Sequence, residues 1–251
     1  MLKIIQFSDT HLFDDTTTTL KQVNTWHTLQ RCVQHAQQNP FDLVLVTGDL
    51  THDGGQPAYH HFRQAFSGLR QPVLVLPGNH DDLALMRATF DKQMQPGFHQ
   101  AGRWQFILLD SLVAGEVGGR LSDQELTRLD TLLTAYDSLH TMICVHHHAV
   151  PVGSEWLDSI MLANAEALFA VLERHPQVRA VTWGHIHQPF HGRHKEIELF
   201  GTPSTCIQFK PAQADFATTT QTPGYRWFHL ADDGRISTET VYLEAGPASR
   251  Q

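Results

Sequence analysis

Short apolar runs alternate with longer amphipathic stretches over the first 183 residues of the chain. The short runs are rich in β-branched residues, as in buried strands, whereas the longer stretches repeat apolar residues at helical spacing. The pattern predicts strands at residues 2–7, 41–46, 72–77, 103–110, 141–145 and 178–183, and helices at residues 20–37, 57–66, 82–94, 122–136 and 163–175. Strands that alternate with helices indicate βαβ units, and therefore an α/β fold with a mainly parallel sheet.

The pattern changes after residue 194. Residues 195–201, 225–230 and 236–243 form strand-like runs joined by Gly and Pro turns, with no helical pattern between them. Such runs favour antiparallel pairing, so we expect the C-terminal part to be mainly β. A chain of 251 residues suits one large α/β domain, and we expect residues 1–251 to form a single domain that includes the strands within 196–243.

Two local features add to this pattern. Ser122 followed by Glu125 predicts a capping box at the start of the fourth helix. Residues 151–162, with the sequence PVGSEWLDSIML, are too irregular for either period and follow a run of three histidines at 146–148. This segment is a candidate cover for a site.

The composition argues against several kinds of partner. The formal net charge of −8 disfavours general attraction to nucleic acid or to an anionic membrane, so we expect neither as an obligatory partner. The sequence contains no run of 18 apolar residues and begins with no secretory signal pattern, so the cytoplasm is the expected location. Three widely spaced cysteines without a CxxC pair predict buried free thiols. We expect a monomer or a homodimer.

Polar residues follow five of the predicted strands at the point where each strand ends. They are SDTH at residues 8–11, GD at 48–49, GNHD at 78–81, HHH at 146–148 and GHIH at 184–187. Because the carboxyl ends of strands in an open α/β sheet form one crevice, these groups should converge in space. A lone histidine in a chain with 18 histidines is more often a surface residue, but five strand ends together predict a metal site.

The set DxH, GD, GNHD, HH and GHxH resembles the motifs of the calcineurin-like metallophosphoesterases, and it extends over residues 4–190. The resemblance implies a four-layer α/β/β/α sandwich with mixed sheets. It also implies two divalent or transition metal ions per chain. The implied ligands are Asp9, His11 and His187 for one ion, Asn79, His146 and His185 for the other, and Asp49 as the bridge between them.

Electrostatics supports a shared carboxylate in such a centre. Two divalent ions ~3.5–4 Å apart repel each other strongly, so a bridging carboxylate and a bridging hydroxide are needed between them. Since most of the implied ligands are neutral, the centre keeps a net positive charge that attracts a phosphoester to an acidic protein. The hydroxide is then expected to attack phosphorus in line. Mixed nitrogen and oxygen ligands suit Fe, Mn, Zn or Co.

His80 is expected to act on the substrate rather than on a metal. The family uses the histidine of GNH in this way, and the resemblance implies that His80 is a general acid that protonates the leaving oxygen. Asp81 is expected to orient His80. The residues expected to contact the substrate are Asn79, His80 and His187.

The sequence supports less specific expectations for the other histidines and for the tryptophans. Strand alternation puts His148 on the same face as His146, whereas the family pattern favours His146 as the ligand, so both stay open. His52, His60 and His61 are expected on a solvated loop and helix face. Trp26, Trp104 and Trp227 are expected to pack in or near the core.

The second motif narrows the range of expected substrates. It reads GDLTHDG, without the arginine of the GDxVDRG motif that phosphoprotein phosphatases use for a phosphomonoester. The segments DTHLF, FDLVLVTGDL, LPGNHD, SEWLD, GHIHQ and TPSTCIQFKP resemble the bacterial class III cyclic nucleotide phosphodiesterases. This resemblance implies hydrolysis of 3′,5′-cyclic AMP to 5′-AMP. Alternatives are a broad phosphodiesterase or nuclease with incidental cyclic nucleotide activity, and a non-catalytic scaffold, which the complete motif set disfavours.

Overall fold

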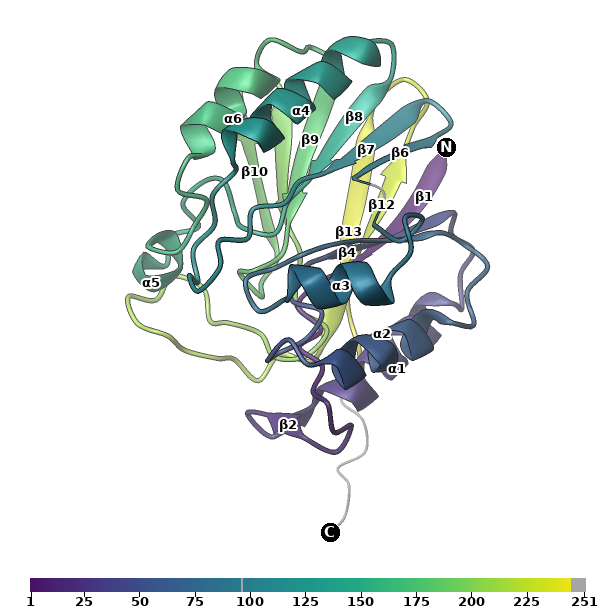
Figure 1. Ribbon diagram of the computed structural model, residues 1–251, viewed down its shortest axis with the longest axis vertical. Helices are drawn as coiled ribbons and strands as arrows, with labels where there is room; N and C mark the ends of the chain where they lie inside the picture. Colours follow the sequence, from purple (N-terminus) through teal and green to yellow (C-terminus); the bar gives the residue numbers. More distant parts are fainter. Residues whose placement is uncertain (96, 245–251) are drawn as a thin grey trace.

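The computed structural model describes residues 1–95 and 97–244. Two mixed sheets pack face to face, and helices cover the outer side of each sheet. Figure 1 shows α4 (Asp123–Ala135) and α6 (Ala165–Leu172) over one sheet, while the helices within residues 25–89 belong to the opposite layer. The four-layer α/β/β/α arrangement expected from the resemblance is therefore confirmed.

The first sheet has the strand order β13-β12-β1-β4-β5. Its parallel strands are β1 (Leu2–Phe7), β4 (Leu43–Thr47) and β5 (Val73–Leu76). Its antiparallel edge consists of β12 (Gly224–Leu230) and β13 (Ile236–Tyr242). The helices that pack on its outer face are α1 (Thr25–Ala36), α2 (Gln56–Phe66) and α3 (Leu83–Thr89).

The second sheet has the order β10-β11-β9-β8-β7-β6. From that edge, its strands are β10 (Phe190–His194), β11 (Ile197–Gly201), β9 (Val178–Trp183), β8 (His140–Cys144), β7 (Trp104–Leu108) and β6 (Phe98–Ala101). β11, β9, β8 and β7 are parallel, and the two edge strands are antiparallel. The helices on its outer face are α4 (Asp123–Ala135) and α6 (Ala165–Leu172).

The central strands are buried on both faces, which explains their continuous apolar sequences. In β4, Val44 and Val46 pack toward the helices, whereas Leu43 and Leu45 pack into the layer between the two sheets. That middle layer joins the leucines of the first sheet to large side chains of the second, such as Phe106 and Met142. The packing fixes the two sheets relative to each other and brings their strand ends to one side of the molecule.

Several local expectations differ from the structure. The helix expected from residue 20 begins at Thr25, because β2 (Thr19–Leu20) and β3 (Val23–Asn24) form a hairpin there, and Asn24 caps the helix. α3 ends at Thr89, not at residue 94, and the edge strands β6 and β10 had no clear sequence signal. The expected antiparallel pairing holds for β12 and β13, but β11 lies parallel to β9.

The capping box at α4 is only half formed. The Ser122 hydroxyl accepts a hydrogen bond from the Glu125 amide, as expected. The Glu125 carboxylate instead accepts bonds from the Asp110 amide and the Arg128 guanidinium. A distant backbone amide and an arginine of the same helix have therefore replaced the return bond of the box.

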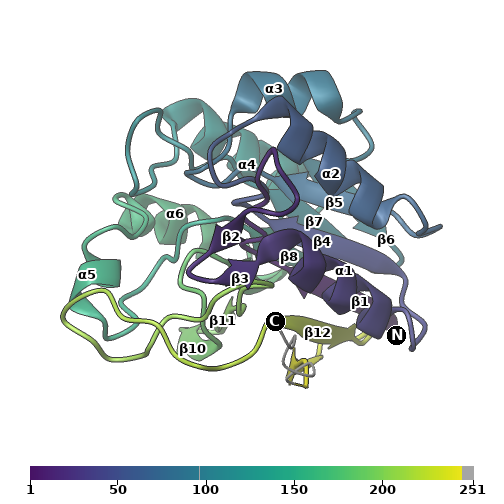
Figure 2. The same cartoon turned by 90° about the horizontal axis from the view of Figure 1, so that it is seen from below.

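Other sequence expectations hold. All three cysteines are free and buried, and Trp104 and Trp227 lie in the core, with Trp26 packed against it. Seen from below in Figure 2, α5 (Glu155–Asp158) lies beside the long loop of residues 202–223, drawn in yellow-green. Within the described residues, no helix has the length and apolarity that crossing a membrane requires.

Candidate metal centre

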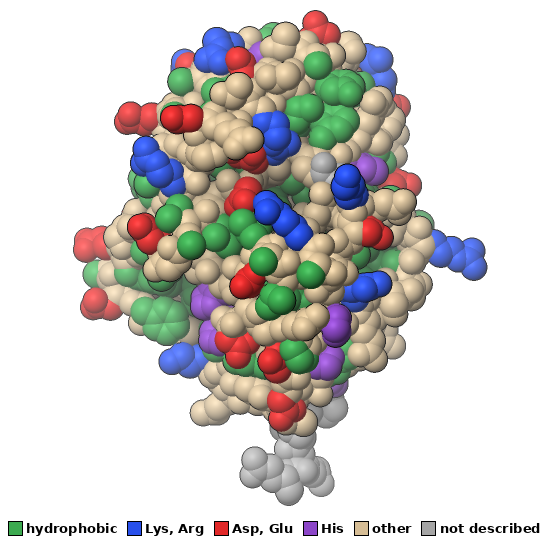
Figure 3. Space-filling model, viewed as in Figure 1, with side chains coloured by type: hydrophobic (Ala, Val, Ile, Leu, Met, Phe, Trp, Pro, Cys, Tyr) green, Lys and Arg blue, Asp and Glu red, His purple; other side chains and the backbone are tan. Residues whose placement is uncertain are grey.

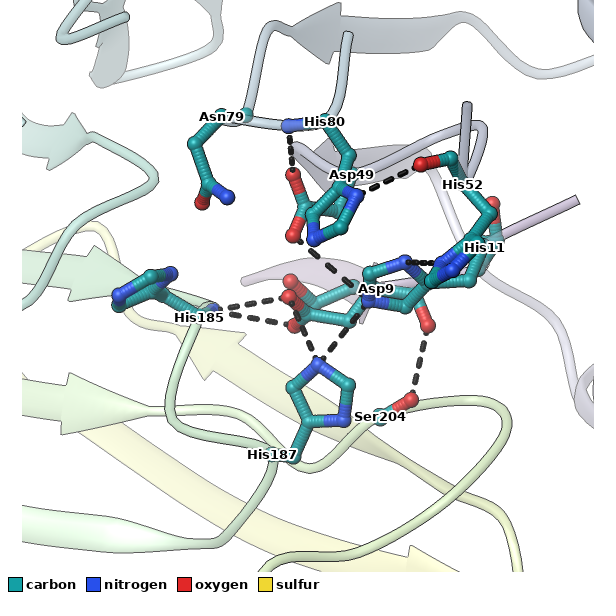
Figure 4. Close-up of polar contacts among 12 residues, drawn as sticks. Asp9, His11, Asp49, His52, Asn79, His80, His185, His187 and Ser204 are labelled. Atoms are coloured by element: carbon teal, nitrogen blue, oxygen red, sulfur yellow. Dashed lines mark hydrogen bonds and ion pairs between the residues drawn. The ribbon is translucent and has the colours of Figure 1, made fainter. Parts of the chain in front are cut away.

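The polar residues that follow five strands meet at one edge, where the two sheets come together. β1, β4 and β5 of the first sheet and β8 and β9 of the second sheet all end there. Figure 4 shows Asp9 and Asp49 in the middle, with Asn79 and His185 on one side and His11 on the other. We call the seven residues that were predicted as ligands the ligand cluster: Asp9, His11, Asp49, Asn79, His146, His185 and His187.

One part of the ligand cluster consists of Asp9, His11 and His187, whose ligand atoms could hold a common ion. Nε2 of His11 lies 3.1 Å from Nε2 of His187, and Nε2 of His187 lies 3.4 Å from an Asp9 carboxylate oxygen. Metal bonds of ~2.1 Å place neighbouring ligand atoms roughly 3 Å apart, so these distances fit ligation.

The other part is centred on His146. Its Nε2 lies 3.1 Å from the Asn79 side-chain oxygen and 3.2 Å from Nδ1 of His185. One carboxylate oxygen of Asp49, Oδ2, is 3.4 Å from His146 Nε2 and 3.6 Å from His11 Nε2. Asp49 thus lies between the two parts with the same oxygen near a nitrogen of each.

Backbone carbonyls orient two of the histidines. Nδ1 of His146 is 2.8 Å from the Thr47 carbonyl, and Nδ1 of His187 is 2.9 Å from the Ile207 carbonyl. A carbonyl only accepts, so each Nδ1 must carry the proton that it donates, which leaves Nε2 of a neutral ring with a lone pair directed into the cluster. Bonds of this kind are typical of metal-binding histidines.

The backbone of the cluster is strained in a consistent way. Asp9, His11, Asp49, His185 and His187 all have positive φ, between 44° and 64°, a region that residues other than glycine seldom adopt. Such conformations persist only where the surrounding structure enforces them, and they gather at functional sites. They turn the chain sharply after the strands, so that side chains from consecutive motifs point inward.

Glycine is required at the turn after β4. Gly48 has a φ of +90°, and a Cβ atom there would collide with the His146 ring. The missing side chain therefore lets a histidine from the second sheet reach the turn of the first.

The pKa shifts in the ligand cluster show where positive charge is stabilised and where it is disfavoured. Burial alone would raise the pKa of Asp49, but His146 and the other nearby histidines hold it well below its usual range. Burial opposes charging of His146, yet Asp49 raises the pKa of this histidine to about 9. Burial lowers the pKa of His11 and of His185 well below 6.5. A buried carboxylate thus attracts positive charge to His146, while His11 and His185 stay neutral, and carboxylate oxygens together with imidazole nitrogens suit divalent cations.

The structure assigns Asp81 a different role from the one expected. Its carboxylate accepts hydrogen bonds from the amides of Leu50, Thr51 and Gly78 and from the Tyr59 hydroxyl. Burial and the nearby Asp49 raise the pKa of Asp81 to about 6. Asp81 therefore joins the turns after β4 and β5, and its hydrogen bonds do not reach the His80 ring.

His52, which was expected on a solvated loop, lies at the site instead. Its carbonyl is 2.6 Å from Nδ1 of His80, its ring stacks on the His80 ring, and its Nδ1 is 3.3 Å from Nδ1 of His11. The position lies three residues after Asp49 of the GD motif, but no local pattern distinguished it from a surface histidine. It is the His52 carbonyl that orients His80.

The three consecutive histidines have different surroundings although all are buried. Only His146 contacts Asn79 and Asp49. His147 is hydrogen-bonded to Ser111 and to the Val117 carbonyl, and burial lowers its pKa to about 3. His148 stacks on His185, lies 3.8 Å from the Asp158 carboxylate, and has a pKa lowered by burial to about 4.

A cavity of about 360 Å³ opens onto the ligand cluster. Its far side is apolar and is formed by three rings, which we call the aromatic wall: Trp156, Phe209 and Phe216. Trp156 belongs to the irregular segment 151–162, which was expected to cover a site and does line this cavity. The sequence alone did not single out these three rings, because their spacing follows no period.

Ser204 is another residue that the sequence did not single out. Its hydroxyl donates to the Asp9 carbonyl at 2.8 Å, and it lies in the TPSTCIQFKP segment of residues 202–211. The Thr205 amide donates to the Ser8 carbonyl. The segment therefore holds the backbone of residues 8–9 in place through hydrogen bonds to its carbonyls. These contacts form only after folding.

Comparison with known proteins agrees with the motifs. The model of the family described as calcineurin-like phosphoesterase matches residues 2–189. The chain belongs to the calcineurin-like phosphoesterase family. This phosphoesterase is 40% identical over 238 residues to the 3′,5′-cyclic adenosine monophosphate phosphodiesterase CpdA of Pseudomonas aeruginosa, covering 94% of this chain and 88% of that protein. It is 39% identical to the protein of the same name from Escherichia coli K12, covering 96% and 90%.

A solved structure supports the fold of this phosphoesterase. A dimetal phosphatase from Danio rerio superimposes with a TM-score of 0.70 at 16% identity, covering 96% of this chain and 98% of that one. At this identity the similarity concerns the fold alone. The fold of this chain is therefore shared with that structure.

Proposed function

We propose that this protein is a metal-dependent phosphodiesterase that hydrolyses 3′,5′-cyclic AMP to 5′-AMP. The observation that carries the proposal is the position of Asp49, with one oxygen near a histidine nitrogen on each side of the ligand cluster. The substrate follows from relatives 39–40% identical that are named as 3′,5′-cyclic AMP phosphodiesterases.

The ligand cluster is proposed to hold two divalent or transition metal ions, with Asp49 shared. Asp9, His11 and His187 complete one site, and Asn79, His146 and His185 complete the other. Nitrogen and oxygen ligands together suit Fe, Mn, Zn or Co. When bound, two such ions would neutralise the phosphate and supply an activated water for attack on phosphorus.

His80 is proposed to protonate the leaving oxygen. Its Nδ1 lies 2.6 Å from the His52 carbonyl, an acceptor, which requires a proton on Nδ1. Nε2 is then the nitrogen that can deliver a proton. As the bond between phosphorus and O3′ breaks, His80 donates this proton to O3′, and the product is 5′-AMP with a free 3′-hydroxyl. Asn79 and His187 are proposed to contact the phosphate beside it.

A diester suits the charge of the cavity better than a monoester does. Among the residues that line the cavity, Lys21 is the single lysine or arginine, and it is exposed at the mouth. A cyclic phosphodiester carries one negative charge, whereas a phosphomonoester approaches two near neutral pH. The arginine of the GDxVDRG motif, which would serve a monoester, is replaced in GDLTHDG.

Product analysis with known metal content tests the proposal. The protein is freed of metal with a chelator, reconstituted separately with Fe, Mn, Zn and Co, and given 3′,5′-cyclic AMP. We expect 5′-AMP as the product and little inorganic phosphate. Rapid release of phosphate from 5′-AMP would indicate a phosphomonoesterase, and equal rates on linear dinucleotides and 2′,3′-cyclic AMP would indicate a broad phosphodiesterase.

A further inference from the structure

The aromatic wall is a packed unit that begins one ring away from the ligand cluster. The Phe209 ring lies on the His187 ring with centroids 4.0 Å apart and planes only 7° from parallel. Trp156 meets Phe209 at 5.0 Å and Phe216 at 5.2 Å, and the two phenylalanines are 5.4 Å apart, all edge to face. The aromatic wall therefore adds an apolar side to a site whose ligand cluster is polar.

The outer part of this wall is exposed to a degree that packing does not explain. Phe216 is 48% exposed, and Val117, across the same cavity, is 53% exposed. They are two of the four large hydrophobic side chains that are exposed in the described part of the chain. Figure 3 shows hydrophobic side chains beside histidines at the lower left, between the positions of α5 and β2 in Figure 1. Apolar surface gathered at a cavity mouth indicates contact with a ligand.

The backbone holds the aromatic wall in place. The Phe209 amide donates to the His187 carbonyl at 3.0 Å, and the amides of Lys210 and Thr219 donate across the loop to Ala217 and Gln208. These bonds form a short ladder that carries Phe209 on one side and Phe216 near its end. A wall that is ordered in this way loses little entropy when a ligand binds, which favours a specific contact.

A lysine stands at the edge of the same wall. Lys21 Nζ lies 5.5 Å from the centre of the Phe216 ring. Lys21 and Gln22 form the turn of the β2–β3 hairpin with φ values of 49° and 70°, which is unfavourable for residues with side chains. The hairpin replaces the first turn of the expected helix and so brings the ammonium group to the cavity.

We propose that the aromatic wall, closed at its edge by Lys21, binds the base of the nucleotide and makes the site selective for cyclic nucleotides. The inference rests on the proposed function. The base and the cyclic phosphate of a nucleotide are attached to one ribose, so a phosphate at the ligand cluster places the base within one sugar of that cluster. The aromatic wall is the apolar surface at that position, and Phe216 has an exposed ring on which a purine stacks.

Paired substrates test this inference. Wild type and Phe216→Ala are compared on 3′,5′-cyclic AMP and on methyl ribofuranoside 3′,5′-cyclic phosphate, which has the same cyclic phosphate but no base. We divide kcat/KM for cyclic AMP by kcat/KM for the substrate without a base. Phe216→Ala should lower this ratio by ~10-fold, mainly because the KM for cyclic AMP increases. Phe216→Trp should keep the ratio. Lys21→Met should lower it by ~2–3-fold.

The control variant is Tyr136→Ala, which removes another exposed aromatic side chain, 38% exposed and outside the cavity. It should leave the ratio unchanged. An unchanged ratio in Phe216→Ala, or an equal loss in Tyr136→Ala, would overturn the base site.

Affinity separates this inference from the proposed function. The dissociation constant of 5′-AMP, the expected product, which is not hydrolysed further, is measured by calorimetry for metal-loaded wild type and Phe216→Ala. A ~10-fold weaker affinity in the variant supports the base site. If wild type then fails to hydrolyse cyclic AMP with any metal, the proposed activity is wrong and the base site stands. Equal affinities would reject the base site whatever the activity.

Discussion

The ligand cluster and the aromatic wall face each other across one cavity, but they are built in opposite ways. The ligand cluster comes from residues directly after buried strands, with carbonyls orienting its rings and strained turns supporting it. The aromatic wall comes from the loop of residues 202–223 and the short segment around α5, and part of it is open to solvent. Strand ends hold side chains with the accuracy that ligation of ions requires. Loops provide a surface that can vary with the substrate to be bound.

We therefore expect substitutions in the two regions to have different effects. Changes in the ligand cluster should affect metal content and turnover of every phosphodiester. Changes in the aromatic wall should affect only substrates with a base, as the paired-substrate experiment measures. Variants at four positions test the division, beginning with the largest expected effect.

Asp49→Ala should have the largest effect. One carboxylate oxygen of Asp49 lies near a histidine of each part of the ligand cluster, so its loss should empty or disorder both metal positions and lower kcat/KM by at least ~10⁴-fold on all substrates. Metal content is measured by mass spectrometry after gel filtration. Asp137→Ala, at an exposed aspartate that does not line the cavity, is the control. Full retention of two ions in Asp49→Ala would exclude the bridging role.

His146→Ala should follow, with loss of one ion and a decrease in kcat/KM of at least ~10³-fold. His148→Ala is the matched control, because both histidines are fully buried in the same run. It should retain both ions and lose packing against His185 and the contact with the Asp158 carboxylate. Loss of metal in the His148 variant but not in the His146 variant would mean that strand alternation, not the family pattern, identifies the ligand.

His80→Ala should keep both ions and lower turnover of cyclic AMP by ~10²–10³-fold, because the ribose 3′-oxygen is a basic leaving group that needs a proton. Bis(p-nitrophenyl) phosphate has a good leaving group, so its hydrolysis should decrease much less. The two substrates are assayed on the same protein samples with measured metal content. Equal decreases on both would mean that His80 positions the phosphate and transfers no proton.

His52→Ala should have the smallest effect of the four. The backbone carbonyl that holds His80 remains, but the stacked ring and its contact with His11 are lost. We expect a decrease in kcat of ~10-fold with both ions retained. His61→Ala, on the partly exposed face of α2, is the control and should behave as wild type. Identical activity in both variants would return His52 to the surface role first expected for it.

Much of the fold could be predicted because its signals are local. The buried strands β1, β4, β5, β8 and β9 are apolar runs, and each ends at a glycine or at polar residues that leave the sheet. The edge strands β6 and β10 were missed because they are short and partly exposed. The hairpin of residues 19–24 was missed because residues after Lys21 continue the helical pattern of α1.

The sequence by itself determined the residue types at the strand ends, and with them the ligand cluster, since strand ends are set by a hydrophobic pattern that needs no distant partner. Only the tertiary structure decided what those residues contact. Asp81 binds backbone amides rather than His80, and His52 lies on His80 rather than in solvent. The aromatic wall also exists only after residues 156, 209 and 216 are brought together. Contacts between separate loops depend on how the two sheets pack, and no local period in the sequence records that packing.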